Sequence, residues 1–375
     1  MPGSIRVGSL LGIPFYINVS WLAIFALVTF YLASEWFPMA HPRWPLELHL
    51  LSATVTSLLF FVSIVLHELA HSVVALRLGL PVRSITLFIL GGVAQIAREA
   101  PHPSGELVMA AAGPLASFAL SALFAALWAA TRELGDPVQS IAAWLAIQNL
   151  ILAIFNMLPG FPMDGGRVLR ALLWWATGSG RRATAIAVAL GRTMALAFIA
   201  GGITILVLNR NGAFLGAQIA IVGWFLHMAA NGSVRQVRLR DALASYTAGD
   251  LMSTGPLSVP METPVQQVVA EYLTPEALQR GMAVVAGTEL RGLVSLHDLN
   301  RVPKHQRQSV QVRYAMTPVS QLAMVHPLTP ALTVLEEMDA RNVNELPVVS
   351  GGVLRGIVTR LHLLRPLETK RRFSW

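Results

Sequence analysis

Long apolar runs alternate with short polar stretches over roughly the first 230 residues of the chain. A membrane-spanning helix needs about 20 apolar residues. Six segments have this character: Ile17–Trp36, Leu51–Leu76, Gly105–Thr131, Val138–Leu158, Ala183–Leu208 and Ala213–Asn231. The third is the weakest, because Pro114 interrupts it. The pattern predicts a polytopic α-helical membrane domain over residues 1–232.

The basic residues predict how this domain is oriented. Six spans place both termini on one side, and cytoplasmic loops are rich in arginine and lysine. With the N-terminus inside, the outside loops carry Arg43, Arg132 and Arg210. The inside segments carry Arg6, Arg77, Arg83, Arg98, Arg167, Arg170, Arg181, Arg182, Arg235, Arg238 and Arg240. We therefore expect both termini in the cytoplasm of a bacterial cell, with the domain in its inner membrane.

Two shorter features complete the membrane part. Val82–Ile96 is apolar and β-branched around Gly91-Gly92, and it is too short to span as a helix. A small sheet on the cytoplasmic side of the bundle would satisfy its backbone groups. Arg192 lies inside the fifth apolar segment. Either the span starts near Arg192, or this side chain faces a polar interior.

Beyond the membrane part, the chain contains an internal repeat with an offset of 64 residues. Gly292–Ser295 matches Gly356–Thr359, and Leu251–Ser253 matches Ala315–Thr317. Two matches at one spacing indicate a duplicated α/β unit. Each copy is expected to hold one helix (Val265–Tyr272; Ala331–Asp339) and two strands (Met282–Val285 and Gly292–Ser295; Leu346–Val349 and Gly356–Thr359). We predict a linker at residues 233–247, then the first copy at residues 248–303 and the second copy with a C-terminal tail at residues 304–375.

Composition narrows the function classes. The chain is 54% hydrophobic and 13% charged, whereas soluble domains carry about 25% charged residues. The net charge is +8, but the arginines flank apolar spans, so we expect no nucleic-acid partner. With no cysteine, disulfides and thiolate metal ligands are excluded.

The sequence His-Glu-Leu-Ala-His at residues 67–71 predicts a metal site in the second span. Residues four apart share a helical face, so His67 and His71 can bind one zinc ion while Glu68 activates a water. A catalytic zinc site has three protein ligands and an open position. The alternative is a hydrogen-bonded polar cluster that stabilises helix packing.

The third ligand is expected from the segment that closes the fourth span, residues 156–167. The second and fourth spans both run from outside to inside, so Asp164 should lie level with His67 and His71. Prolines in this segment forbid a continuous helix. Its free backbone could pair with an extended substrate strand. A turn aspartate is the alternative for Asp164.

These motifs together resemble the site-2 protease family of intramembrane metalloproteases. The resemblance rests on residues 67–71, Gly91-Gly92, residues 113–117 (Gly-Pro-Leu-Ala-Ser) and residues 156–167, and it covers roughly residues 5–230. It implies that Asp164 binds zinc and that Glu68 is the general base.

The resemblance also implies roles for amides. It implies that Asn156 binds the substrate backbone or the developing oxyanion, and that Asn149 and Pro162 shape this region. Interhelical hydrogen bonding is an equal alternative for both asparagines. Met163 stands where the family usually has leucine. Ser117 stands where asparagine is common, so no polar role is carried over to it.

The repeat resembles a tandem CBS-domain pair, a module that commonly binds adenine nucleotides such as ATP or AMP. The ribose-contacting pattern is matched in the first copy by Gly292, Leu293, Ser295 and Asp298. The second copy has Gly356, Ile357 and Thr359, but His362 replaces the aspartate. The resemblance thus implies one complete nucleotide anchor. The alternative is a module for interaction or homodimerisation alone.

The hypothesis that combines these features is an intramembrane zinc metalloendopeptidase. It would cleave a transmembrane segment of a single-span or other membrane protein near its cytoplasmic end, with the CBS pair responding to nucleotide. The rival hypothesis is a zinc transporter or a catalytically silent membrane sensor. The polar residues lie at one depth and form no path across the bilayer, which disfavours transport.

Overall fold

The computed structural model describes residues 3–89, 91–96, 99–131, 136–208, 212–255, 257–271, 281–287, 289–341 and 343–373. The chain divides into two compact units, Met1–Val234 and Arg235–Trp375. Four residues used in the predictions, Arg98, Arg132, Arg210 and Tyr272, lie outside the described residues.

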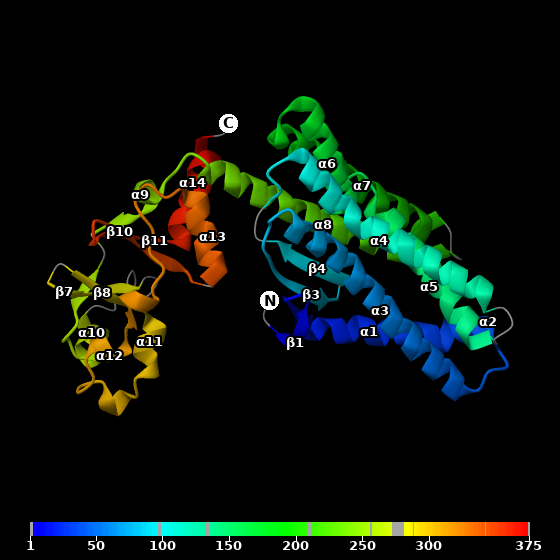
Figure 1. Cartoon of the computed structure of the whole chain (residues 1–375), viewed down its shortest axis with the longest axis horizontal. Helices are drawn as coiled ribbons and strands as arrows, with labels where there is room; N and C mark the ends of the chain where they lie inside the picture. The colour runs from blue at the N-terminus through cyan, green and yellow to red at the C-terminus, as the bar shows by residue number, and fades with distance from the viewer. Residues whose placement is uncertain are drawn as a thin grey trace. The chain divides into compact units, whose positions relative to one another are not determined.

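The first unit is a bundle of long apolar helices (Figure 1). Its helices are α1 (Val19–Tyr31), α2 (Phe37–Ala40), α3 (Leu46–Arg77), α4 (Pro103–Ala130), α5 (Asp136–Asn156), α6 (Asp164–Thr177), α7 (Gly180–Leu208) and α8 (Ala213–Leu243), and the residues of α8 from Arg235 onward belong to the second unit. A π-helical turn, Leu32–Trp36, joins α1 to α2. Within the described residues, six stretches are long and apolar enough to cross a membrane: Val19–Ala40, Leu46–Arg77, Pro103–Ala130, Pro137–Asn156, Gly180–Leu208 and Ala213–Gly232. The predicted polytopic membrane domain is confirmed.

Three details bear on the expected spans and linker. α4 continues through Pro114, because neighbouring membrane helices can satisfy the backbone groups that a proline frees. α7 is one unbroken helix in which the Arg192 side chain is exposed, so this arginine does not face a polar interior. α8 continues to Leu243, through much of the segment predicted as a linker.

A four-stranded sheet belongs to the first unit. Its strands, in spatial order, are β1 (Ser4–Leu10), β2 (Ile13–Asn18), β3 (Val82–Phe88) and β4 (Gly91–Ile96). The predicted sheet around Gly91-Gly92 is thus present, enlarged by an N-terminal hairpin that the sequence patterns did not indicate. β4 forms one edge of the sheet and packs against α3.

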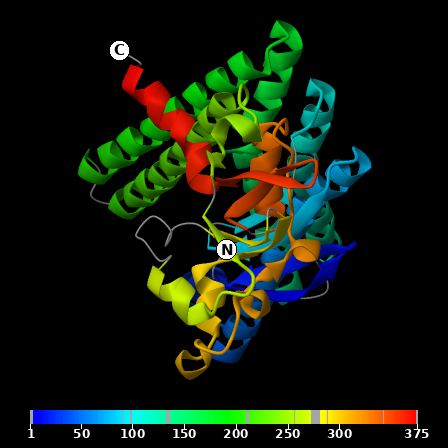
Figure 2. The same cartoon turned by 90° about the vertical axis from the view of Figure 1, so that its left-hand side faces the viewer.

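Close backbone contacts fix the position of α7 and of the segment between α5 and α6 in the bundle. α7 and α8 run side by side (Figure 2), and a Cβ on Gly202 would overlap the backbone of Ala220. Nearer the N-terminus of α7, Gly191 lies against the main chain of Phe161 in the segment between α5 and α6. Glycine is needed at both positions, because any side chain would separate the packed backbones.

The second unit is an α/β pair whose sheet shows the duplication. Its strands are β5 (Ser253–Thr254), β6 (Ser258–Pro260), β7 (Met282–Ala286), β8 (Glu289–Val294), β9 (Thr317–Pro318), β10 (Glu345–Ser350) and β11 (Val353–Thr359). Its helices are α9 (Ala248–Leu251), α10 (Val265–Glu271), α11 (Leu296–Arg301), α12 (Val312–Ala315), α13 (Ala331–Arg341) and α14 (Arg360–Phe373).

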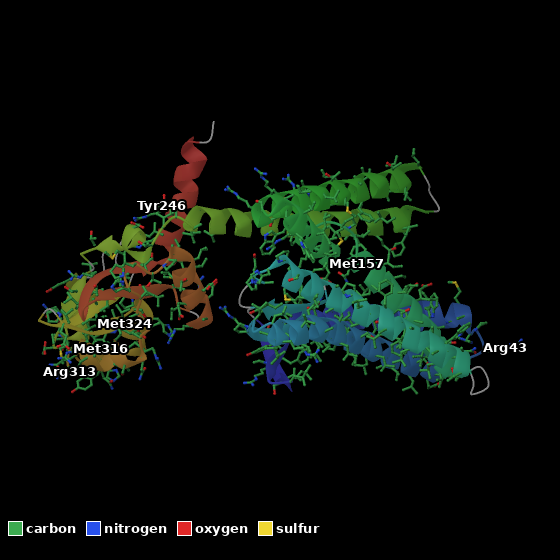
Figure 3. All side chains as sticks on the ribbon, turned by 45° about the horizontal axis from the view of Figure 1, so that its top comes forward. Arg43, Met157, Tyr246, Arg313, Met316 and Met324 are labelled. Carbon is green, nitrogen blue, oxygen red and sulfur yellow. The ribbon has the colours of Figure 1, made fainter. Side chains whose placement is uncertain are left out.

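The two copies exchange short strands. The sheet order is β10-β11-β8-β7-β6, with β5 of the first copy pairing β11 and β9 of the second pairing β8. Met316, labelled in Figure 3, packs beside Gly292 where β9 meets β8, and Met252 packs beside Gly356 in the matching place. The four strands predicted from the repeat are all present, and each copy has its own apolar core.

Candidate metal centre

Helix α3 brings two buried imidazoles to one face. His67 and His71 are one helical turn apart, and each is 4% exposed. Their ring centroids are 5.0 Å apart, and the Nε2 atoms lie 3.3 Å from each other. The i, i+4 spacing therefore places both imidazoles on one face of the helix, as the sequence predicted.

Asp164 reaches the same point from the first residue of α6. Its Oδ2 lies 3.1 Å from Nε2 of both His67 and His71. The irregular segment before it includes Met157, labelled in Figure 3, and a Cβ on Gly165 would overlap the Met157 carbonyl. This glycine lets α6 start directly against the preceding chain, which places Asp164 opposite α3.

The three side chains form the one group in the described residues that could hold a metal through histidine, cysteine or carboxylate atoms. Their ligand atoms lie within 4.8 Å of one another. Two imidazoles and a carboxylate are a ligand set of catalytic zinc sites. Gly113 of α4 backs the site, since a Cβ there would overlap Nε2 of His71 and lie 2.6 Å from Nε2 of His67. The donors and this space fit a zinc ion.

Hydrogen bonds at the far side of each ring fix the imidazoles. Nδ1 of His71 lies 2.7 Å from the Met109 carbonyl oxygen, which can only accept, so Nδ1 carries the proton and Nε2 keeps its lone pair for a metal. Nδ1 of His67 lies 2.9 Å from Oγ of Ser117. Sequence reasoning gave Ser117 no polar role, yet this hydroxyl holds a predicted ligand in place.

Glu68 of α3 lies beside the two histidines, and its side chain contacts the edge strand β4. Its Oε2 accepts a hydrogen bond from the Ala94 backbone N–H of β4 at 3.1 Å. Gly92 on the same strand makes room for it, since a Cβ there would come within 2.6 Å of Cγ of Glu68. One carboxylate oxygen is thus anchored, and Oε1 is available for proton transfer.

A cavity of about 560 Å³ opens at this point. Its polar lining includes Glu68, Asn156, Asp164 and both histidines, together with Arg167 and the β4 backbone. Its apolar lining includes Phe60, Phe61, Ile64, Leu152, Phe155 and Pro162. The candidate metal ligands and Glu68 therefore face a largely apolar cavity between the long apolar helices and β4.

The two asparagines fall in different places. Asn156 ends α5 and lines the cavity. Asn149 is fully buried, and its Nδ2 donates to Ser63 of α3 at 3.3 Å and to the Leu145 carbonyl at 2.8 Å. Asn149 therefore makes the interhelical hydrogen bond that was its alternative role.

The predicted nucleotide residues cap helices of the second unit. Asp298 Oδ2 accepts from the Ser295 backbone N–H at 3.0 Å and from its hydroxyl at 2.6 Å, a reciprocal capping box at the start of α11. In the second copy, Nδ1 of His362 accepts from the Thr359 backbone N–H at 3.3 Å. The histidine thus replaces the aspartate as a cap, because its ring nitrogen is also an acceptor.

Comparisons with known proteins agree with this geometry. A family model described as "Peptidase family M50" matches residues 55–133 and 129–200, and the CBS domain model matches residues 248–305 and 312–368. The fold and site define a multi-pass membrane zinc metalloprotease with a CBS pair.

Relatives extend the similarity along the whole chain. "Putative zinc metalloprotease sll0528" of Synechocystis sp. is 33% identical and is matched over 98% of this chain and 97% of its own. "Putative zinc metalloprotease Rip3" of Mycobacterium tuberculosis is 33% identical over 99% of this chain and 94% of its own. A solved site-2 protease from Methanocaldococcus jannaschii is 29% identical, with a TM-score of 0.44, over 61% of this chain and 94% of that one. The chain belongs to peptidase family M50, the site-2 proteases.

Proposed function

We propose that this zinc metalloprotease cleaves a transmembrane segment of another membrane protein, near the cytoplasmic end of that segment. The observation that carries the proposal is the position of His67, Glu68 and His71 within α3, a helix long and apolar enough to span a membrane. The apolar walls of the cavity suit the side chains of such a substrate.

The chain's own residues divide the reaction among them. His67, His71 and Asp164 would hold the zinc, whose chemistry is to polarise the scissile carbonyl and to supply a nucleophilic water at neutral pH. Glu68 takes a proton from the attacking water on Oε1 and returns it to the leaving amine as the C–N bond breaks. Asn156 donates a hydrogen bond from its amide N–H to a carbonyl oxygen of the substrate backbone or to the developing oxyanion.

Purified full-length protein with zinc and a single-span substrate in liposomes tests the proposal. We expect cleavage by the wild type and a loss of at least about 1,000-fold in kcat for Glu68→Gln, a typical cost of removing an essential proton-transfer group. Equal cleavage by both would remove Glu68 as the base. Zinc flux into vesicles that His71→Ala abolishes, without proteolysis, would support the transporter instead.

Orientation is the second part of this proposal. Both termini and the CBS pair lie in the cytoplasm, on the argument of the flanking arginines. Because the chain has no cysteine, single cysteines report topology without background. An impermeant maleimide applied to intact cells should label Glu47→Cys in the first turn of α3 and spare Arg181→Cys at the start of α7. The reverse pattern would overturn the orientation.

We also propose that the CBS pair binds an adenine nucleotide, such as ATP or AMP, at Ser295, Asp298 and Thr359, and that two molecules of the protein form a homodimer through their CBS pairs. Supporting this, Asp298 uses Oδ2 for its cap, so its other oxygen can accept a ribose hydroxyl. Calorimetry on the full-length protein should show binding that Asp298→Ala weakens at least about 10-fold, because a charge-assisted hydrogen bond is lost. Unchanged binding would defeat the site assignment, and a monomer by mass photometry would defeat the dimer.

A further inference from the structure

The cavity beside the metal centre contains one arginine among its described lining residues, Arg167 of α6. Arg167 follows Asp164 by three residues, so the two side chains lie on one face of α6 and reach the same cavity. The guanidinium is therefore close to the reaction site. Its side chain is 27% exposed, open enough to meet a ligand.

The ion pair between Arg167 and Glu106 is long. Nε of Arg167 lies 3.9 Å from Oε1 of Glu106, a buried carboxylate in the first turn of α4. Among the described residues this is the only ion pair or hydrogen bond of the Arg167 side chain. Arg170, one turn further along α6, is better paired, at 3.3 Å from Glu106 and 2.9 Å from Glu99.

This difference leaves donors of Arg167 available in an apolar surrounding. A guanidinium carries five N–H donors, and donors that lose water without gaining an acceptor are costly. The apolar lining residues, such as Phe60, Leu152 and Phe155, offer no acceptor, and among the described residues Arg167 makes no hydrogen bond to the polar lining residues. A ligand that enters the cavity can therefore stabilise Arg167 by supplying acceptor oxygens to its free donors.

An unwound peptide is such a ligand. In a helix the carbonyl oxygens are bonded within the segment, whereas an extended segment presents them outwards. A guanidinium can donate two parallel hydrogen bonds to neighbouring oxygens, as it does to carboxylates. Main-chain carbonyls need no particular side chain, so this recognition works for any sequence that can unwind.

We propose that Arg167 binds main-chain carbonyl oxygens of the unwound substrate, and that Glu106 is a positioning residue that directs Arg167 into the cavity. The inference rests on the proposed function, because it assigns the substrate-binding cation of the same site. Arg170 anchors the pair, since its two carboxylate partners tie α6 to α4 and to the segment before α4.

Substrate binding and turnover by the full-length protein test this assignment. The variants are Arg167→Gln, Arg167→Lys and Glu106→Gln, with Arg192→Gln as the control, since Arg192 is exposed on α7 and does not line the cavity. Binding of a fluorescent single-span peptide is measured in nanodiscs, KM and kcat on the same peptide, and zinc content by mass spectrometry.

We expect Arg167→Gln to weaken peptide binding about 10–100-fold and to raise KM in proportion, with kcat and zinc content little changed. Arg167→Lys should retain part of the binding, because an ammonium donates but cannot form the planar fork. Glu106→Gln should have a smaller effect than Arg167→Gln, and Arg192→Gln none.

Three results would overturn the proposal. One is wild-type affinity in Arg167→Gln. Another is loss of zinc from Arg167→Gln, which would make Arg167 a support of the metal site. The third is weakened binding only for peptides with an acidic side chain, which would indicate carboxylate recognition. A wild type that binds peptide but never cleaves it would refute the proposed function, while the binding ratio would still decide the role of Arg167.

Discussion

Two aspartates at helix N-termini, one in each unit, show how differently a carboxylate can be used. Asp164 opens α6, and its Oδ2 meets two imidazoles of another helix at 3.1 Å. Asp298 lies in the first turn of α11, and the same atom meets the hydroxyl and the N–H of Ser295, three residues away. Both aspartates lie in the first turn of a helix, but their hydrogen-bond partners differ.

The comparison teaches that convergence of separate elements makes the metal centre. Asp164 lies against the histidines of another helix because Gly165 lets α6 start tightly against the preceding chain and Gly113 leaves space beside the imidazoles. Asp298 is satisfied locally, so its binding role depends on the oxygen that the cap leaves over. The helix cap of Asp298 is therefore complete without a bound ligand. The ligand atoms of His67, His71 and Asp164 instead converge on one point that a metal ion would fill.

Replacing Asp164 should have the largest effect. Asp164→Asn removes the charge and a strong ligand, so we expect zinc affinity to fall by more than about 100-fold and peptidase activity to be lost. Zinc content after dialysis against a chelator measures this. Asp298→Asn is the matched control at the other helix N-terminus, and it should keep its zinc. Equal zinc loss in both variants would contradict the distinction drawn between them.

Filling the space behind the histidines should come next. In Gly113→Ala the new methyl would overlap Nε2 of His71, so zinc binding and activity should fall by about 100-fold or more while the protein stays folded. Gly105→Ala on the same helix places its Cβ 3.5 Å from Leu78, an ordinary contact, and should behave as wild type. Titration with a zinc chelator and circular dichroism separate binding from folding. Normal zinc affinity in Gly113→Ala would show that the space is not needed.

Loss of a hydrogen bond behind a ligand should have a moderate effect. Ser117→Ala frees Nδ1 of His67, and we expect a 10–100-fold weaker zinc affinity, a typical cost of removing a ligand's outer partner. Ser121→Ala is the control, because the Ser121 hydroxyl donates a hydrogen bond of 2.8 Å to the Ala146 carbonyl and makes none to a metal ligand. The experiment is competition with a fluorescent zinc indicator. Similar affinities for the two variants would mean that His67 is oriented without Ser117.

The smallest effect is expected for Glu345 in the second unit. Burial raises the pKa of this carboxyl above its ordinary value of 4.5, the nearby Asp298 raises it further, and the Gly281 backbone N–H, bonded at 2.6 Å, lowers it. A raised folded-state pKa means that stability is present below the ordinary value and is lost as the pH rises through the raised value. Glu345→Gln keeps the acceptor without the charge, so it should gain stability relative to wild type above the raised pKa.

Hydrogen exchange of β7 and β10 peptides in the full-length protein, compared at pH 5 and pH 8, checks this prediction. The variant should be modestly better protected than wild type at pH 8, with a smaller difference at pH 5. Glu289→Gln is the control, because Glu289 is exposed at the start of β8. A larger gain at pH 5 than at pH 8 would contradict the sign of the pKa shift.

Much of the site could be predicted from the sequence, because its chemistry is concentrated in short motifs. The histidine spacing fixed a helical face, and the directions of two spans placed Asp164 level with it. The partner of His71 could not be predicted, because it is a backbone carbonyl, that of Met109, which any residue would supply. The role of Gly113 depends on how closely α4 approaches α3, which no local pattern encodes.

The fold shows the same limits. Apolar length predicted the spans, and the 64-residue repeat predicted the strands of the second unit. The β1–β2 hairpin was missed because β2 runs directly into the first apolar run, whose predicted span starts at Ile17, inside this strand. The pairing of Glu106 with Arg170 was missed because it joins segments far apart in the sequence.

A metal-bound structure of the full-length protein, with zinc located by anomalous scattering, tests the central claim most directly. The account predicts one zinc ion bound by Nε2 of His67 and His71 at about 2.0–2.1 Å and by an oxygen of Asp164 at about 2.0–2.2 Å, with a fourth position open to the cavity. A zinc ion that binds both histidines while every oxygen of Asp164 stays more than about 3 Å away would contradict it.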